Sequence, residues 1–124
     1  MRQFENVVSD KGSKYAVSGG PVADREAAKK FLHTLKRQKK YGRATHNSWA
    51  LLYRGETGDL VRVKNDDGES GAGNVILSNL EREGLEGHII VVTRWYGGVH
   101  LGGDRFRHVQ TCTRHYLDHW QSSD

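Results

Sequence analysis

The feature that most constrains this chain is a short apolar run followed at once by a glycine-rich stretch. Residues 88–92 read His-Ile-Ile-Val-Val, which is too short and too β-branched for a buried helix. This run predicts a central strand covered on both faces. Residues 93–106 then read Thr-Arg-Trp-Tyr-Gly-Gly-Val-His-Leu-Gly-Gly-Asp-Arg-Phe, and apolar residues recur at helical spacing as far as Trp120. The pattern predicts a strand, a glycine loop, and a helix capped by Asp104.

Such a loop resembles phosphate-binding loops, because backbone N–H groups at a helix N-terminus attract anions. The glycine spacing is not Gly-x-Gly-x-x-Gly, however, and no Gly-Lys-Ser/Thr triplet follows. Asp104 would also place a carboxylate where the anion should sit. We therefore interpret the glycines as serving tight turns and packing around Trp95 and Tyr96, with ligand binding as the alternative.

Periodicity and turn residues divide the remaining chain into short elements. The expected elements are strands at 4–9 and 14–18, a helix at 25–40, strands at 44–54 and 60–63, a helix ending near 84, the strand at 88–92 and a helix from 105. Asp24 is placed to cap the first helix. The predicted order is ββαββαβα.

Length and composition indicate one compact domain over residues 1–124. The chain is 35% hydrophobic and contains one Cys and one Pro, and a chain of this size buries enough surface to need no disulfide. Cys112 falls on the apolar stripe of the last helix and is predicted to be a core residue. No apolar run approaches the ~20 residues of a membrane span, and the N-terminus lacks a signal-peptide core. We expect a cytoplasmic protein.

Charge is unevenly distributed along the chain. Residues 1–64 hold 14 Lys and Arg against 6 Asp and Glu, whereas residues 65–124 hold 5 against 9. Such asymmetry can mark a surface for nucleic acid or an acidic protein, although solvated helix faces are its commoner cause. We expect any RNA contact to be weak, non-specific and centred on the first helix. Its basic residues are Lys29, Lys30, Lys36, Arg37, Lys39 and Lys40.

Common metal and catalytic motifs do not match this sequence. The 7 histidines include no His-Glu-x-x-His pair and no Cys/His cluster. The acidic loop at 65–73 lacks the ligand series of a calcium hand, and its Gly-Glu-Ser-Gly-Ala segment narrowly misses a nucleophile elbow. We expect no metal, no cofactor and no catalytic residue.

The acidic loop and the glycine loop are too polar to be explained by core packing alone. We expect them to lie side by side, with Arg94 pairing with Asp66, Asp67 or Glu69. His46 could join from the neighbouring strand or be a hydrogen-bonded structural histidine. The polar cleft expected between the two loops would accept a side chain or the backbone of a partner. The candidate partner-binding residues are His46, Asn47, Asp66, Asp67, Glu69, Arg94, Trp95, Tyr96 and Arg105.

Four sequence blocks cover nearly the whole chain. They read Ser-Asp-Lys-Gly-Ser-Lys-Tyr at 9–15, Ala-Thr-His-Asn at 44–47, Asp-Asp-Gly-Glu at 66–69 and Thr-Arg-Trp-Tyr-Gly-Gly-Val-His-Leu-Gly at 93–102. In this order they resemble the IMPACT family, whose bacterial relatives include the YigZ proteins. The Trp-Tyr pair and the Asp-Arg-Phe at 104–106 resemble the eukaryotic branch.

The resemblance implies an α+β two-layer sandwich, with helices packed on a mixed β-sheet, similar to the second domain of small-subunit ribosomal protein five. It also implies a non-catalytic role in translational control, in which the protein competes with the kinase of initiation factor two for its ribosome-associated activator. Actin is a further family partner. The RWD domain of eukaryotic members and the small second domain of YigZ proteins are not expected here. The alternatives are an RNA- or ribosome-binding domain, and an enzyme with a site joining His46, Asp66, Asp67 and Arg94.

Overall fold

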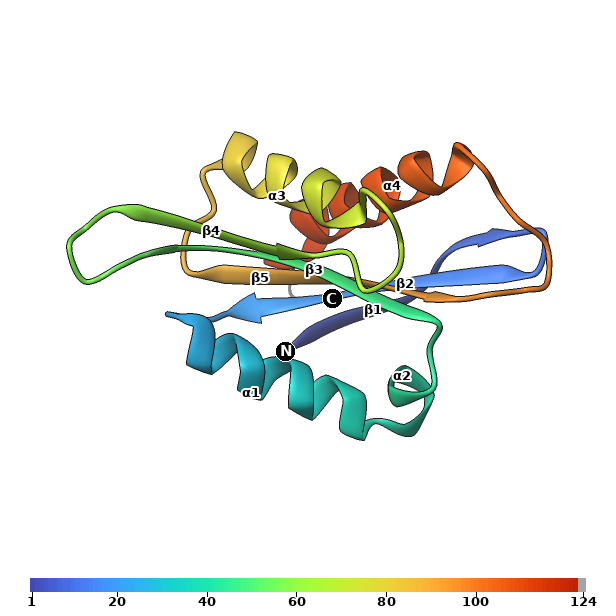
Figure 1. Cartoon of the computed structure of the whole chain (residues 1–124), viewed down its shortest axis with the longest axis horizontal. Helices are drawn as coiled ribbons and strands as arrows, with labels where there is room; N and C mark the ends of the chain where they lie inside the picture. Colours follow the sequence, from blue (N-terminus) through green and yellow to red (C-terminus); the bar gives the residue numbers. More distant parts are fainter. Residues whose placement is uncertain (123–124) are drawn as a thin grey trace.

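A computed structural model describes residues 1–122 of the chain (Figure 1). Its elements are β1 (Arg2–Asp10), β2 (Ser13–Pro21), α1 (Arg25–Arg37), α2 (Lys39–Gly42), β3 (His46–Arg54), β4 (Leu60–Asn65), α3 (Ala72–Glu83), β5 (His88–Trp95) and α4 (Asp104–His119). The predicted order is confirmed, with the short α2 as an addition. No helix within the described residues is both long and apolar enough to cross a membrane.

The strands form one five-stranded sheet in the order β1-β2-β5-β3-β4, and every neighbouring pair is antiparallel. The α+β class is confirmed, but the expected mixed sheet is wrong. β5 enters between the two hairpins and runs opposite to both of its neighbours, which leaves no parallel pair. Because no two neighbouring strands are parallel, no crossover connection has to join neighbours within the sheet.

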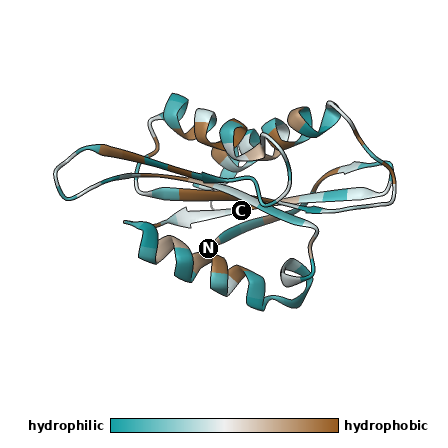
Figure 2. Cartoon of the chain, in the orientation of Figure 1, coloured by the Kyte–Doolittle hydropathy of each residue, from teal (hydrophilic) through white to brown (hydrophobic). Residues whose placement is uncertain are grey.

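Helices cover both faces of the sheet, so the fold has three layers where two were expected. Figure 1 shows α3 and α4 on one face and α1 and α2 on the other. The reason lies in β5, whose side chains are apolar on both sides: Ile90 and Val92 join the cluster under α3 and α4, while Ile89 and Val91 join the cluster over α1. Figure 2 shows hydrophobic residues along the sheet and hydrophilic ones on the outer faces of the helices.

The cluster under α4 includes Cys112, whose side chain is fully buried as predicted. Burial raises the pKa of this thiol to about 12, because the thiolate would lose its hydration. The thiol therefore stays protonated at neutral pH and behaves as a small apolar side chain.

Two helix ends differ from expectation. The helix predicted to reach Lys40 breaks at Gln38, where ψ is 113° and the backbone N–H donates to the carbonyl of Leu35. Asp24 caps α1 as predicted, because its Oδ1 accepts the N–H of Ala27 at 2.9 Å. Asp104 does not cap α4. Gly103 takes a helical conformation, so the helix starts one residue early and Asp104 lies in its first turn.

Candidate functional site

Arg94 lies near the end of β5, which runs to Trp95, three residues beyond its predicted end. In the sheet it is paired with His46 on β3 and with Tyr15 on β2. Side chains alternate along a strand, so Arg94 points to the same side as Val92, toward α3 and α4. Trp95 points to the other face, where its indole N–H donates to the carbonyl of Lys40 at 2.9 Å.

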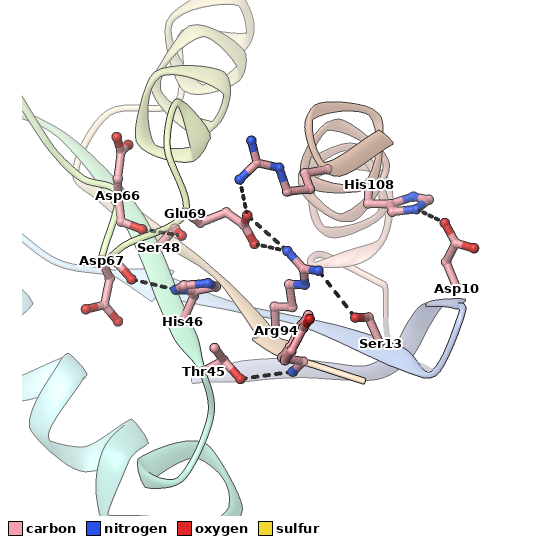
Figure 3. Close-up of polar contacts among 12 residues, drawn as sticks. Asp10, Ser13, Thr45, His46, Ser48, Asp66, Asp67, Glu69, Arg94 and His108 are labelled. Atoms are coloured by element: carbon pink, nitrogen blue, oxygen red, sulfur yellow. Dashed lines mark hydrogen bonds and ion pairs between the residues drawn. The ribbon is translucent and has the colours of Figure 1, made fainter. Parts of the chain in front are cut away.

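A buried ion pair joins the two polar loops (Figure 3). Nη1 of Arg94 lies 3.1 Å from both carboxylate oxygens of Glu69, and the two side chains are 5% and 4% exposed. Nη1 of Arg105, at the start of α4, lies 3.3 Å from the same carboxylate. The acidic loop and the glycine loop therefore meet at Glu69, with one carboxylate between two guanidinium groups.

The other two carboxylates of the acidic loop bind backbone amides instead. Asp66 accepts the N–H groups of Gly71 at 3.0 Å and Gly73 at 2.8 Å, and so caps α3, whose N-cap residue has no side chain. Asp67 accepts the N–H of Asn47 at 2.8 Å. Figure 3 shows both carboxylates turned away from Arg94. Of the three acids expected as possible partners of Arg94, Glu69 is the one that forms the pair, because the two aspartates have nearer amide donors.

His46 contacts the acidic loop through its ring. Nδ1 lies 2.8 Å from the backbone carbonyl oxygen of Asp67, which can only accept a hydrogen bond. The proton of the neutral imidazole is therefore on Nδ1, and Nε2 carries a lone pair. Asn47 lies on the opposite face of the sheet, where its side chain donates to the Tyr41 carbonyl at 3.0 Å and accepts the hydroxyl of Thr93 at 2.7 Å. Asn47 thus supports β3 from behind the site.

Several residues beside Arg94 were not singled out by the sequence patterns. Nη2 of Arg94 lies 3.4 Å from Oγ of Ser13, and the Tyr15 ring lies 5.7 Å from the guanidinium carbon. His108 packs edge-on against Tyr15 and donates from Nε2 to Asp10 at 2.7 Å, a hydrogen bond that holds the pKa of Asp10 below its usual value. Asp10, Ser13 and Tyr15 all belong to the sequence block at 9–15, so that block was the signal from which they could have been found.

A cavity of about 490 Å³ opens at this point of the fold. Its lining residues are Thr45, His46, Glu69, Arg94, Tyr96, His100, Leu101, Gly102 and Arg105. Tyr96 is held over Arg94 because its backbone N–H donates to Oγ1 of Thr45 at 2.9 Å, and its ring lies 5.7 Å from the guanidinium carbon. The structure thus brings His46, Glu69, Arg94, Tyr96 and Arg105 together, whereas Asn47, Asp66 and Asp67 support the site and Trp95 lies on the opposite face.

The six basic residues predicted to contact RNA are all exposed on α1 and α2, in the layer across the sheet from the cavity. Lys29 pairs with Glu26 at 3.4 Å and Lys40 with Glu5 at 2.9 Å. The other four have no ion-pair partner among residues 1–122. They are Lys30, Lys36, Arg37 and Lys39.

Comparison with known proteins identifies the family. A family model described as the Impact N-terminal domain matches residues 11–117. The chain belongs to the IMPACT family. Protein IMPACT of Rattus norvegicus is 36% identical over 111 residues, which cover 89% of this chain and 35% of that protein. The IMPACT homologue of Caenorhabditis elegans is 38% identical over 114 residues, covering 90% and 44%. The chain thus spans less than half the length of these IMPACT proteins.

Two solved structures extend the comparison. A crystal structure of a hypothetical protein superposes with a TM-score of 0.82 at 25% identity, covering 94% of this chain and 57% of that one. The two-domain translational regulator Yih1 superposes with a TM-score of 0.58 at 31% identity, covering 88% and 43%. Both similarities extend over nearly all of this IMPACT-family chain.

Proposed function

We propose that this chain is a non-catalytic interaction domain that acts in translational control. The observation that carries this function is its kinship with Yih1, described as a translational regulator, at 31% identity over 88% of the chain. The cavity supports an interaction role, because Tyr96 is 44% exposed and lies beside Arg94. Tyrosine and arginine at the centre of a surface depression are the residue types that dominate protein–protein binding energies.

The finer role follows from the family resemblance. The domain acts in the response to amino-acid starvation by occupying the ribosome-associated activator of the initiation-factor-two kinase, which leaves less activator for the kinase. Actin is a second partner. The chain spans 35% of the length of the rat relative, and we propose this role for the matched part alone.

The arrangement of the polar groups favours binding over catalysis. His46 and Arg94 line the cavity, but the carboxylate of Asp67 binds the N–H of Asn47 and that of Asp66 caps α3. Glu69 is bound by two arginines, so its carboxylate oxygens are already engaged in ion pairs. An acid–base pair made of His46 and an acidic-loop carboxylate therefore lacks a free carboxylate.

RNA or ribosome binding through α1 and α2 is the second candidate. The observation that favours it is the group of four exposed basic side chains without ion-pair partners among the described residues. Because this layer lies across the sheet from the cavity (Figure 1), the two surfaces can act independently. Phosphate contacts of this kind supply affinity without reading sequence.

A pull-down from eukaryotic lysate, with and without nuclease, tests both candidates. The interaction role predicts recovery of translational proteins that persists after nuclease treatment. Recovery that disappears with nuclease would favour the RNA candidate. Recovery of only non-translational proteins, or robust turnover of small substrates by the purified chain, would overturn the proposed function.

A further inference from the structure

The walls of the cavity carry one more positive than negative group. Arg94 and Arg105 both line it, and Glu69 is the one carboxylate among its lining residues. The remaining acidic groups of the adjacent loop are held elsewhere, because Asp66 caps α3 and Asp67 binds β3. The cavity therefore has an uncompensated positive charge that a single anionic group would neutralise.

Hydrogen-bond donors remain unused on the two arginines that line this cavity. Arg94 is 4% exposed, and its Nε, which is itself covered from solvent, has no hydrogen-bond partner among residues 1–122. Arg105 uses Nε toward the carbonyl of Gly102 at 2.9 Å and Nη1 toward Glu69, which leaves its Nη2 without a partner in the described part of the chain. Since guanidinium groups bind carboxylates through two parallel N–H groups, the arginine pair is suited to an oxyanion with a planar, forked shape.

One exposed apolar side chain, Tyr96, lines the same opening. Among the described residues, four large hydrophobic side chains are exposed, and three of them belong to the glycine loop or the start of α4. Tyr96 and Val99 are in the glycine loop, and Phe106 follows Arg105 directly, with its ring 5.7 Å from that guanidinium carbon. Their exposed fractions are 44%, 46% and 43%. A charged cavity bordered by exposed apolar side chains is the arrangement expected of a protein-binding surface.

The surrounding charge argues against a polyanion at this opening. The acidic loop beside the cavity carries Asp66, Asp67 and Glu69. A nucleic acid would bring many phosphates close to these three carboxylates, and aromatic stacking would have to overcome that repulsion. A single carboxylate matches the local excess of charge in the cavity and avoids the acidic residues around it.

From these observations we infer that the cavity binds an Asp or Glu side chain of a partner protein, with an apolar residue of the same segment packing on Tyr96. The carboxylate lies between Arg94 and Arg105, across from Glu69. This binding mode deepens the proposed function and rests on it, because it names the chemistry by which the interaction domain recognises its partner.

A display library of short random peptides, selected against the full chain, tests this recognition. Selected peptides are expected to carry Asp or Glu next to a Leu, Ile, Val or aromatic residue. Changing that acidic residue to its amide should weaken binding at least roughly tenfold, because the arginines lose a charged partner. Arg105→Gln should weaken binding to a similar degree.

The matched control is Arg107→Gln, which removes the same charge from the same helix. Arg107 is 68% exposed, pairs with Asp104 at 3.5 Å and does not line the cavity. Its peptide affinity should equal that of the unaltered chain. Circular dichroism and urea unfolding of both variants establish that each is folded.

The contradicting outcomes are specific. Failure to select any peptide, selected peptides without acidic enrichment, or equal binding by Arg105→Gln would each overturn the inference. Full displacement of the peptides by millimolar inorganic phosphate would assign the cavity to a free anion and overturn it. Binding of an oligouridylate that is lost in Arg105→Gln would assign the site to RNA, with the same consequence.

The pull-down separates failure of this inference from failure of the proposed function. If the unaltered chain and Arg105→Gln recover translational proteins equally, the interaction role stands and the cavity is not the recognition site. If acidic peptides bind through Arg105 while translational proteins are not recovered, the recognition chemistry stands and the translational role fails.

Discussion

Arg94 places Nη1 3.1 Å from both carboxylate oxygens of Glu69, and neither side chain is more than 5% exposed. Arg94→Ala should lower the free energy of unfolding by about 3 kcal/mol, because it leaves a buried carboxylate with only Arg105 as a partner. It should also weaken partner binding. Urea unfolding and affinity measurements on the same protein preparation check both effects.

The exposed pair of Arg62 and Glu81, 2.8 Å apart, provides the control. Because these side chains are 50% and 37% exposed, Arg62→Ala should cost less than about 1 kcal/mol. Equal costs for the two substitutions would show that burial of the Arg94 pair has no bearing on stability.

Asp66 is predicted to act on stability through α3. Asp66→Ala removes the acceptor for the N–H groups of Gly71 and Gly73, so it should cost about 1–2 kcal/mol. Those two amides should also exchange with solvent faster. Asp59→Ala, in the exposed turn after β3, should change stability by less than about 0.5 kcal/mol. An unaltered exchange rate at Gly71 in Asp66→Ala would argue against the capping role.

Gly97 is predicted to tolerate no side chain. A Cβ at this position would lie 2.1 Å from the backbone carbon of Gly12, in the β1–β2 turn, where no flexible side chain can yield. Gly97→Ala should therefore cost about 3 kcal/mol or more, measured by thermal unfolding. Gly103→Ala is the control, since nothing lies within 4 Å and its φ is −65°. It should be neutral or stabilising by up to about 1 kcal/mol.

His88 should make stability fall as the solution is acidified. The residue is 2% exposed, and burial lowers the pKa of its imidazole from 6.5 to about 4. The unfolded chain gains a proton here as pH falls through 6.5, whereas the folded chain does not until about 4. The contribution of His88 to the free energy of unfolding is therefore complete above pH 6.5 and is lost as the pH falls from 6.5 to about 4. The loss is roughly 2 kcal/mol at about pH 5.

Urea unfolding at neutral and mildly acidic pH measures this loss. His88→Gln should reduce the pH dependence, even if the variant is less stable at neutral pH because Nε2 no longer contacts the Tyr116 hydroxyl at 2.6 Å. His33→Gln, at an exposed position on α1, should retain the slope of the unaltered chain. An identical slope in all three proteins would assign the acid sensitivity to other groups.

RNA binding, where it occurs, should depend on the basic layer. Replacing Lys36 and Arg37 together by Glu should abolish it, and the affinity of the unaltered chain should fall steeply as salt is raised. Arg82 on α3 and Arg107 on α4 are exposed across the sheet from that layer. The same double charge reversal there should leave RNA affinity largely intact. Affinity that is insensitive to salt, or unchanged in the first variant, would exclude α1 as the site.

The order of elements could be predicted because the relevant signals are local. Apolar periodicity identified every strand and the three long helices, and the cap of α1 at Asp24 was predicted correctly. The meeting of the two polar loops was also predictable, since both were too polar for the core. These inferences needed only neighbours in sequence and the alternation of buried positions.

Long-range geometry set the limit of prediction. The local sequence does not show which role each of Asp66, Asp67 and Glu69 takes, yet one caps a helix, one holds a strand and one pairs with Arg94. Their roles depend on which donors the folded backbone presents. The helix break at Gln38 has no Gly or Pro to mark it. The antiparallel pairing of β5 arises because β5 inserts between two hairpins that are distant from it in sequence.

The cavity draws its walls from β3, β5, the loop before α3 and the start of α4, segments spread from Thr45 to Arg105. A partly folded intermediate in which one of these segments is not in place therefore does not contain the cavity. A partner that enters the cavity must therefore bind the native state alone, and by mass action it draws the chain away from its unfolded forms. Protection from proteolysis should rise with partner concentration, so the occupancy of this opening would help set how long the protein survives in the cell.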